Sequence, residues 1–220
     1  MTPLLAVTGA VLVLSVAGAA AAQDRPPLTR GDVAGTVGWT AVDTTEIGSY
    51  SSYAPWHGQG LFTAGVGWYW TDHLKTDVEI GATTTTQIYG SIPLEIAGLR
   101  QYVPSQIGLS STRVAVVQRY QFGRNQWFHP SVGAGVDLVR QRITRREDAV
   151  FVYDQITRQG RLVRETIQHA AEEDFGARAL LIAGFKGYFT PRTFLLGDMR
   201  VTFASRPHDV LLRLGIGVDF

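Results

Sequence analysis

Apolar and polar residues alternate with a period of two along most of the chain from Gly31 onward. The C-terminal segment shows this pattern most clearly, because every second side chain in it is large and apolar. Those apolar residues are Leu212, Leu214, Ile216, Val218 and Phe220, and Arg213, Gly215, Gly217 and Asp219 lie between them. Strict alternation is typical of a β-strand whose two faces meet different surroundings. We predict eight strands, at about residues 31–42, 60–70, 75–89, 113–122, 128–141, 175–189, 193–204 and 212–220.

The lengths of these strands favour a membrane over water. Each has roughly 10–15 residues, whereas a tilted strand needs about 9–11 to cross a bilayer and strands in soluble proteins average about 5–6. Tight turns are predicted at 71–73, 123–126 and 190–192, and the opposite ends carry longer segments at 43–59, 91–107 and 143–174, then a short one at 205–209. The sequence therefore predicts an all-β, eight-stranded antiparallel transmembrane up-and-down β-barrel, with short periplasmic turns and longer extracellular loops. A soluble sandwich or lipocalin-like barrel is the alternative, but its inner faces would have to exclude many charges.

Aromatic residues crowd beside the predicted tight turns, and we expect them to form a belt at the periplasmic interface. They are Trp68, Tyr69, Trp70, Tyr120, Phe122, Trp127, Phe128, Tyr188, Phe189 and Phe220.

The N-terminal segment differs from the rest of the chain. Residues 1–22 are almost wholly apolar or small and end in three alanines before Gln23, which predicts a secretory signal peptide. No lysine or arginine precedes the apolar stretch, so a retained anchor is the alternative. We expect a signal peptide at 1–22, a short leader at 23–30 and the barrel domain at 31–220. The chain has no cysteine, so disulfides and a lipid anchor at the cleavage point are excluded.

Placing the apolar faces against lipid sends charged side chains of both signs into the lumen. They are Asp77, Glu79, Arg113, Arg119, Asp137, Arg178, Lys186, Asp198, Arg200, Arg213 and Asp219. An eight-stranded barrel is only wide enough for side chains to fill it. We therefore predict a network of ion pairs that plugs the lumen, with a narrow ion path as the alternative. The net charge of +1 gives no reason to expect a nucleic acid as partner.

Two segments resemble those of a known family. The closing run from Leu212 to Phe220 resembles the C-terminal strand signal that outer-membrane barrels present to their assembly machinery. Residues 130–137 look like the Pro-x-x-Gly-x-Gly strand of small barrels similar to outer-membrane proteins A, X and W. The resemblance implies the cell outer membrane of a Gram-negative-type bacterium, with outer-membrane lipid, lipopolysaccharide and the assembly machinery as partners. It implies little about function, because these families include anchors, adhesins and small channels.

Catalytic chemistry has one candidate. His129 and Ser131 have the spacing found in lipid A deacylase barrels, where a histidine activates a serine. They follow a predicted periplasmic turn, however, and Gln141 occupies the place expected for the orienting acid. The histidines show no metal-ligand spacing, and the Gly-x-Gly pairs lie within strands. We therefore expect no enzyme activity, no catalytic residue, no metal and no cofactor.

The predicted loops are the better place to look for recognition. Residues 50–56 are rich in tyrosine and serine, and residues 150–154 and 161–165 could pair as a hairpin above the membrane. Four arginines near the base of that hairpin would lie where glycolipid phosphates are found: Arg140, Arg142, Arg145 and Arg146. Lipopolysaccharide or an external protein is a possible partner there, and a merely solvated loop is the alternative. We predict a non-catalytic outer-membrane barrel with a structural or surface-interaction role, ahead of a narrow solute channel and a lipid A-modifying enzyme.

Overall fold

The computed structural model describes residues 30–44, 56–96, 99–122, 127–154, 159–204 and 207–220. Its strands are β1 (Gly31–Asp43), β2 (Trp56–Tyr69), β3 (Leu74–Thr83), β4 (Thr86–Ile96), β5 (Leu99–Gln121), β6 (Phe128–Glu147), β7 (Val150–Asp154), β8 (Gln159–Arg164), β9 (Ile167–Gln168), β10 (Glu172–Tyr188), β11 (Thr193–Phe203) and β12 (Pro207–Asp219). The predicted signal peptide, most of the leader, the Tyr/Ser-rich residues 50–53 and the turn at 123–126 lie outside the described residues. In the described part of the chain, no helix is long and apolar enough to span a membrane.

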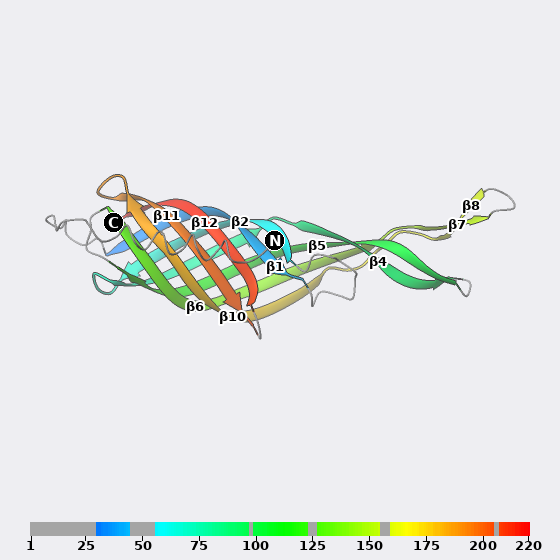
Figure 1. Ribbon diagram of the computed structural model, residues 1–220, viewed down its shortest axis with the longest axis horizontal. Coiled ribbons are helices and arrows are strands. Elements are labelled where there is room, and N and C mark those ends of the chain that lie inside the picture. Colours follow the sequence, from blue (N-terminus) through cyan, green and yellow to red (C-terminus); the bar gives the residue numbers. More distant parts are fainter. Residues whose placement is uncertain (1–29, 45–55, 97–98, 123–126, 155–158, 205–206) are drawn as a thin grey trace, which may run out of the picture.

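Eight of the described strands close into a barrel (Figure 1). Around the wall they run β5-β3-β2-β1-β12-β11-β10-β6, and β6 pairs with β5 to complete the ring. Every pairing is antiparallel, and the first and last strands meet at a seam where Phe220 N donates to Gly31 O at 2.9 Å. Closure matters because an open sheet edge in lipid would leave backbone groups without partners. The predicted all-β, eight-stranded antiparallel barrel is confirmed.

Two of the strands continue far beyond the barrel. β5 has 23 residues and β6 has 20, and their pairing extends from Gln121↔Ser131 to Ser105↔Glu147. The outer half of β5 also pairs with β4, and β7 and β8 form a separate hairpin farther along the chain. We call the described residues within 86–109 and 140–175 the extension, which projects from one end of the barrel (Figure 1).

The extension corrects part of the expected loop pattern. Residues 91–107 were expected to be a loop, but they form most of the β4–β5 hairpin. The predicted third strand, 75–89, is interrupted after Thr83, where Gly60 N donates to Thr84 Oγ1 at 2.9 Å. Pro93 lies in β4 and Pro104 in β5, so prolines occur within both strands of this hairpin. The hairpin expected from residues 150–154 and 161–165 is present as β7 and β8.

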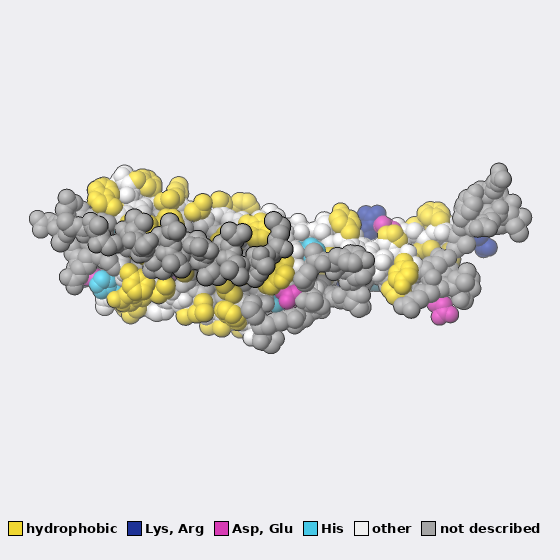
Figure 2. Space-filling model, in the orientation of Figure 1, with side chains coloured by type: hydrophobic (Ala, Val, Ile, Leu, Met, Phe, Trp, Pro, Cys, Tyr) yellow, Lys and Arg dark blue, Asp and Glu magenta, His cyan; other side chains and the backbone are white. Residues whose placement is uncertain are grey.

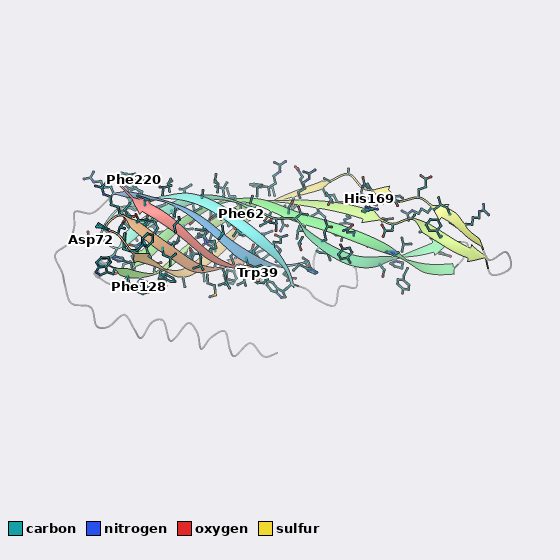
Figure 3. The ribbon with its side chains drawn as sticks, turned by 90° about the horizontal axis from the view of Figure 1, so that it is seen from above. Trp39, Phe62, Asp72, Phe128, His169 and Phe220 are labelled. Carbon is teal, nitrogen blue, oxygen red and sulfur yellow. The ribbon has the colours of Figure 1, made fainter. Side chains whose placement is uncertain are left out.

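The outer face of the barrel is apolar, as the alternation predicted. Phe62, Ile80, Leu181 and Val116 are exposed on it, and Figure 2 shows hydrophobic side chains over the outside of the barrel. On the side that Figure 2 shows, lysine and arginine appear only over the extension. Figure 3 labels Asp72, Phe128 and Phe220 at the short-turn end and His169 in the extension. Large exposed apolar faces on a closed barrel are suited to lipid rather than to water.

The predicted aromatic belt needs correction at two positions, Tyr69 and Tyr188. Trp68 and Trp70 are exposed on the outer face at the short-turn end, but Tyr69 between them points inward and donates to Asp32 Oδ2 at 3.1 Å. Tyr188 also points inward, where its hydroxyl hydrogen-bonds Asp219. Successive side chains of a strand take opposite faces, so three consecutive aromatic residues cannot all belong to the belt.

Candidate functional site

The interior of the barrel carries an equal number of acidic and basic side chains. Among the described residues, seven carboxylates and seven cations are buried on the lumen side of the strands, so their formal charges cancel, and an eighth buried carboxylate, Asp43, lies at the end of β1 out of phase with the lumen-facing positions. They are Asp32, Asp77, Glu79, Asp137, Asp198, Asp209 and Asp219, and Lys75, Arg113, Arg119, Arg178, Lys186, Arg200 and Arg213. A buried charge without a partner costs several kcal/mol, on the order of the stability of a domain, so this balance is a condition for folding.

At the short-turn end, two lysines hold the carboxylates of the first and last strands. Asp32 and Asp219 are direct register partners across the β1–β12 seam. Lys186 Nζ donates to Asp32 Oδ2 at 2.8 Å and to Asp219 Oδ1 at 2.5 Å. Lys75 Nζ lies 2.7 Å from the same Asp32 oxygen and 2.6 Å from Asp77 Oδ1. Two like charges that face each other across the closing seam are thus neutralised by a shared cation.

Aromatic rings enclose the same cluster. Lys186 Nζ lies 3.8 Å from the centre of the Phe194 ring and 5.1 Å from that of Tyr188. It also donates to Tyr69 OH at 2.8 Å. Cation–π attraction is strongest where water is absent, so these rings add to the stabilisation of a buried ammonium.

Above this cluster, three arginines bind three acids. Arg213 binds Asp198 bidentately, with Nε to Oδ1 at 2.8 Å and Nη2 to Oδ2 at 2.7 Å. Its Nη1 also donates to Glu79 Oε2 at 2.6 Å, and Arg200 Nη2 donates to the same oxygen at 2.5 Å. Arg119 Nε donates to Asp77 Oδ2 at 2.9 Å, which connects this layer to the lysines below. Bidentate contacts of this kind fix the orientation of both partners as well as their distance.

The layer nearest the extension is less completely paired. Arg113 Nη2 donates to Asp209 Oδ2 at 3.0 Å and its Nη1 lies 3.2 Å from Asp137 Oδ2, while Arg178 Nη1 is 3.6 Å from Asp209. Within the described residues, Asp137 Oδ1, Arg113 Nε and Arg178 Nη1 have no hydrogen-bond partner from the protein. Buried polar atoms of this kind are usually satisfied by water, which this layer could receive from the extension side.

Glycines on the inner face make room for the charged side chains. A Cβ at Gly67 would lie 2.0 Å from Lys75 Cε and 2.4 Å from Asp32 Oδ1. At Gly65 it would lie 2.6 Å from Glu79 Cγ, and at Gly184 it would lie 2.5 Å from Asp198 Cβ. No larger residue fits at these positions unless the ion pairs move. The remaining space beside Lys75 and Glu79 is a cavity of about 20 Å³, which is room for about one water molecule.

All eleven residues predicted to line the lumen lie at buried inward positions. Sequence reasoning missed Asp32, Lys75 and Asp209, which complete the balance. Lys75 could have been found, because it stands two residues before Asp77 on the same face. Asp209 fell in a segment that we expected to be a short loop, whereas β12 begins at Pro207.

The four arginines of the predicted glycolipid site do not share one face. Arg140, Arg142 and Arg146 are exposed on the outer face of β6, whereas Arg145 lies on the inner face. Arg140 Nη2 lies 2.5 Å from Glu173 Oε2, Arg146 Nε lies 3.5 Å from Asp148, and Arg145 Nη2 lies 3.6 Å from Glu172. Within the described part of the chain, Arg142 has no ion-pair partner. The structure thus separates three outward arginines from one inward arginine.

The remaining predicted positions are also placed. The five apolar residues of the proposed assembly signal are exposed on the lipid-facing side of β12 and at the C-terminus: Leu212, Leu214, Ile216, Val218 and Phe220. Ser131 is buried in the lumen, where it accepts a hydrogen bond from Arg119 Nη1 at 3.4 Å, and the His129 ring packs edge-on against Tyr188. No group of three or more potential metal ligands occurs among the described residues.

Comparison with known proteins identifies the class. The model of the outer membrane protein β-barrel domain matches residues 8–219, so the chain belongs to this family of outer membrane β-barrel proteins. Among solved structures, Neisserial surface protein A is 13% identical with a TM-score of 0.51, and the match covers 88% of this chain and 98% of that one. The N-terminal barrel domain of Pseudomonas aeruginosa OprF is 14% identical with a TM-score of 0.49, covering 87% and 98%. No curated protein matches the chain.

The family places the protein in the cell outer membrane, in agreement with the prediction. The likeness to Neisserial surface protein A shows a shared fold, and at 13% identity it shows the fold alone. In this setting the short turns face the periplasm and the extension stands on the extracellular side.

Proposed function

We propose that the protein is a non-catalytic outer-membrane barrel with a plugged lumen, and that its extension carries a structural or surface-interaction role. The observation that carries the proposal is the balanced interior: fourteen buried charges tie opposite walls together, and a cavity beside Lys75 and Glu79 has room for only about one water molecule. A lumen filled in this way leaves little space for a solute. The extension, in contrast, offers exposed side chains on a rigid base.

The arrangement of the one catalytic candidate supports the non-catalytic part of this proposal. Ser131 lies on the inner face of β6 and is held by Arg119, whereas the acyl chains of membrane lipids lie outside the barrel. A serine that attacks a lipid ester has to meet the lipid. If His129→Ala abolished a change in lipid mass caused by the wild-type protein, the non-catalytic part of the proposal would be wrong.

A narrow channel is the second candidate function, favoured by the incompletely paired layer at Arg113, Asp137 and Arg178. Planar-bilayer conductance of the purified protein separates the two candidates, with heated and unheated gel mobility as the control for folding. We expect the folded wild type to be silent. Reproducible single-channel steps that change on substitution of Arg113 would favour the channel and contradict the plug.

A matched pair of variants sharpens this experiment. Glu79→Ala combined with Arg200→Ala removes one acid and one base from the middle of the lumen, so that charge balance is kept and Arg213 retains Asp198. We expect this variant to conduct. Arg140→Ala combined with Glu173→Ala removes one acid and one base from the extension instead. We expect that variant to show no conductance, like the wild type.

A further inference from the structure

The lipid-facing band of the barrel carries one polar spot. Thr76 on β3 and Gln118 on β5 are register partners, and both point outward. Apart from residues at the two rims, the other outward positions of the described barrel strands are apolar, aromatic or glycine. The outward neighbours of the pair along its own two strands follow this rule: Leu74, Val78, Val116 and Tyr120. A glutamine in such surroundings needs a hydrogen-bond partner, because hydrocarbon offers none.

Hydrogen bonds fix the direction in which the Gln118 amide points. Trp70 Nε1 donates to Thr76 Oγ1 at 2.7 Å, and Thr76 Oγ1 donates to Gln118 Oε1 at 2.6 Å. The hydroxyl gives its only hydrogen to the amide oxygen, so an amide turned the other way would lose this bond. Gln118 Nε2 therefore points away from Thr76, and it has no hydrogen-bond partner in the part of the chain that the structure describes.

The depth of Gln118 in the membrane narrows the choice of partner. Gln118 lies two residues farther from the short turns than Tyr120 of the aromatic belt, so it lies on the hydrocarbon side of that belt. An amide N–H without an acceptor is costly in hydrocarbon, because the tails cannot accept a hydrogen bond and water is scarce there. The ester carbonyls of the lipids lie at the level of the belt. An acceptor at the depth of Gln118 itself has to come from a protein.

A second Gln118 supplies that acceptor. A carboxamide is self-complementary, because it carries both a donor and an acceptor, and Oε1 keeps a second lone pair beside the bond from Thr76. Two copies related by a two-fold axis along the membrane normal have the same orientation in the membrane, and identical surfaces meet at the same depth. Each Gln118 Nε2 can then donate to Oε1 of the other copy.

The surface beside Gln118 is even enough for two barrels to approach each other. Val78, Val116 and Val136 are register partners in the row next to Gln118, on the side of the extension, and Ala134 is its partner on β6. The three valines are 43%, 47% and 48% exposed, so none of them projects far beyond the others. Sheets that pack face to face lie about 10 Å apart, which two glutamine side chains can span from opposite sides.

We infer that the wall formed by β3, β5 and β6 is a contact surface for a second copy of this chain, with a pair of Gln118 amides at its centre. Small and β-branched residues surround the pair and allow the close approach that side-chain hydrogen bonds in a membrane require. The inference goes beyond the plugged lumen, because it concerns the outer wall and holds whether or not the lumen conducts.

The test measures energy transfer between donor- and acceptor-labelled copies of the refolded full chain in phosphatidylcholine vesicles. The chain has no cysteine, so Gln106→Cys in the extension provides a single labelling site outside the membrane. We expect energy transfer to rise with the ratio of protein to lipid. Gln118→Leu removes the amide pair, and we expect the dissociation constant to rise at least about fivefold. Ile216→Ala on the opposite wall is the control, and its constant should stay within about twofold of the wild type.

Two further measurements separate association from folding and locate the contact. Leucine suits a lipid-facing position, so Gln118→Leu should keep the heated and unheated gel mobility of the wild type. Spin labels at Val116→Cys should lie close together in the dimer, whereas labels at Ile216→Cys should lie farther apart by about two barrel widths. The inference would be overturned by a lack of energy transfer at every ratio, which would leave lipid as the partner of the amide. An unchanged constant in Gln118→Leu, or a shorter distance at position 216 than at 116, would overturn it as well.

Discussion

The barrel interior and the extension use the same chemistry in opposite surroundings. Arg213 and Asp198 meet at 2.7 Å with side chains that are 1% and 0% exposed. Arg140 and Glu173 meet at 2.5 Å with side chains that are 59% and 46% exposed. The distances alone would rank the second pair at least as strong as the first.

Burial reverses that ranking when one partner is removed. In water, a released arginine regains its hydration, so an exposed pair contributes about 0–1 kcal/mol. In the lumen, the remaining carboxylate is not hydrated after its partner is removed, and breaking a buried pair costs about 3–5 kcal/mol. The comparison shows that the barrel needs its interior ion pairs to be stable, whereas the exposed ion pairs of the extension can exchange partners at little cost in free energy.

The largest effect is expected at the seam. Lys186→Met keeps most of the unbranched stem of the side chain but leaves Asp32 and Asp219 facing each other without their shared cation. We expect the free energy of unfolding to fall by about 3–5 kcal/mol, measured by urea unfolding in lipid vesicles. Adding Asp219→Asn to this variant removes the repulsion and should restore much of the loss. If the double variant is no more stable than the single one, repulsion across the seam is not the cause.

A smaller effect is expected from a single methyl group. Gly67→Ala would bring a Cβ to 2.0 Å from Lys75 Cε, so the lysine has to leave Asp32 or Asp77. Overpacking of this kind costs about 1–3 kcal/mol, and the same unfolding assay measures it. Gly35→Ala is the control, because Gly35 lies on the outer face and no atom lies within 4 Å of the new Cβ. Equal losses in both variants would show a general intolerance of side chains rather than crowding of the ion pairs.

The barrel could be predicted from the sequence because its two faces meet lipid and a charged lumen. Because of that contrast, apolar residues such as Leu214 and Ile216 alternate with polar ones such as Arg213 along each strand. From this alternation, eleven interior charges could be assigned to the lumen face, where the structure places them. The partners of those charges could not be predicted. Lys186 and Asp32 are 154 residues apart and meet only because the first and last strands close the ring.

The extension was harder to predict for a physical reason. The segment 86–109 buries Ile88, Val103, Ile107 and Leu109 on its inner face, whereas the barrel strands carry charges on the inner face and apolar residues on the outer face, so the rule of alternation that holds for the barrel does not hold for the extension. The division of the four arginines between two faces depends on the strand continuing through Arg145 and Arg146. We expected this strand to end at Gln141, and beyond the end of a strand the sequence does not show on which face an arginine lies. The pairing of Arg140 with Glu173 likewise depends on the β6–β10 register.

The smallest effect is expected for the exposed pair of Arg140 and Glu173, although its distance is shorter than that of Arg213 and Asp198. A double-mutant cycle with Arg140→Met and Glu173→Gln should give a coupling free energy of at most about 1 kcal/mol, and salt should reduce it further. The equivalent cycle in the lumen, with Arg213→Met and Asp198→Asn, should give a coupling several times larger that salt hardly changes. Unfolding in urea at low and high ionic strength measures both. A coupling of similar size in the two regions would mean that water reaches the lumen pairs, and the plugged interior would then have to be abandoned along with the contrast between barrel and extension.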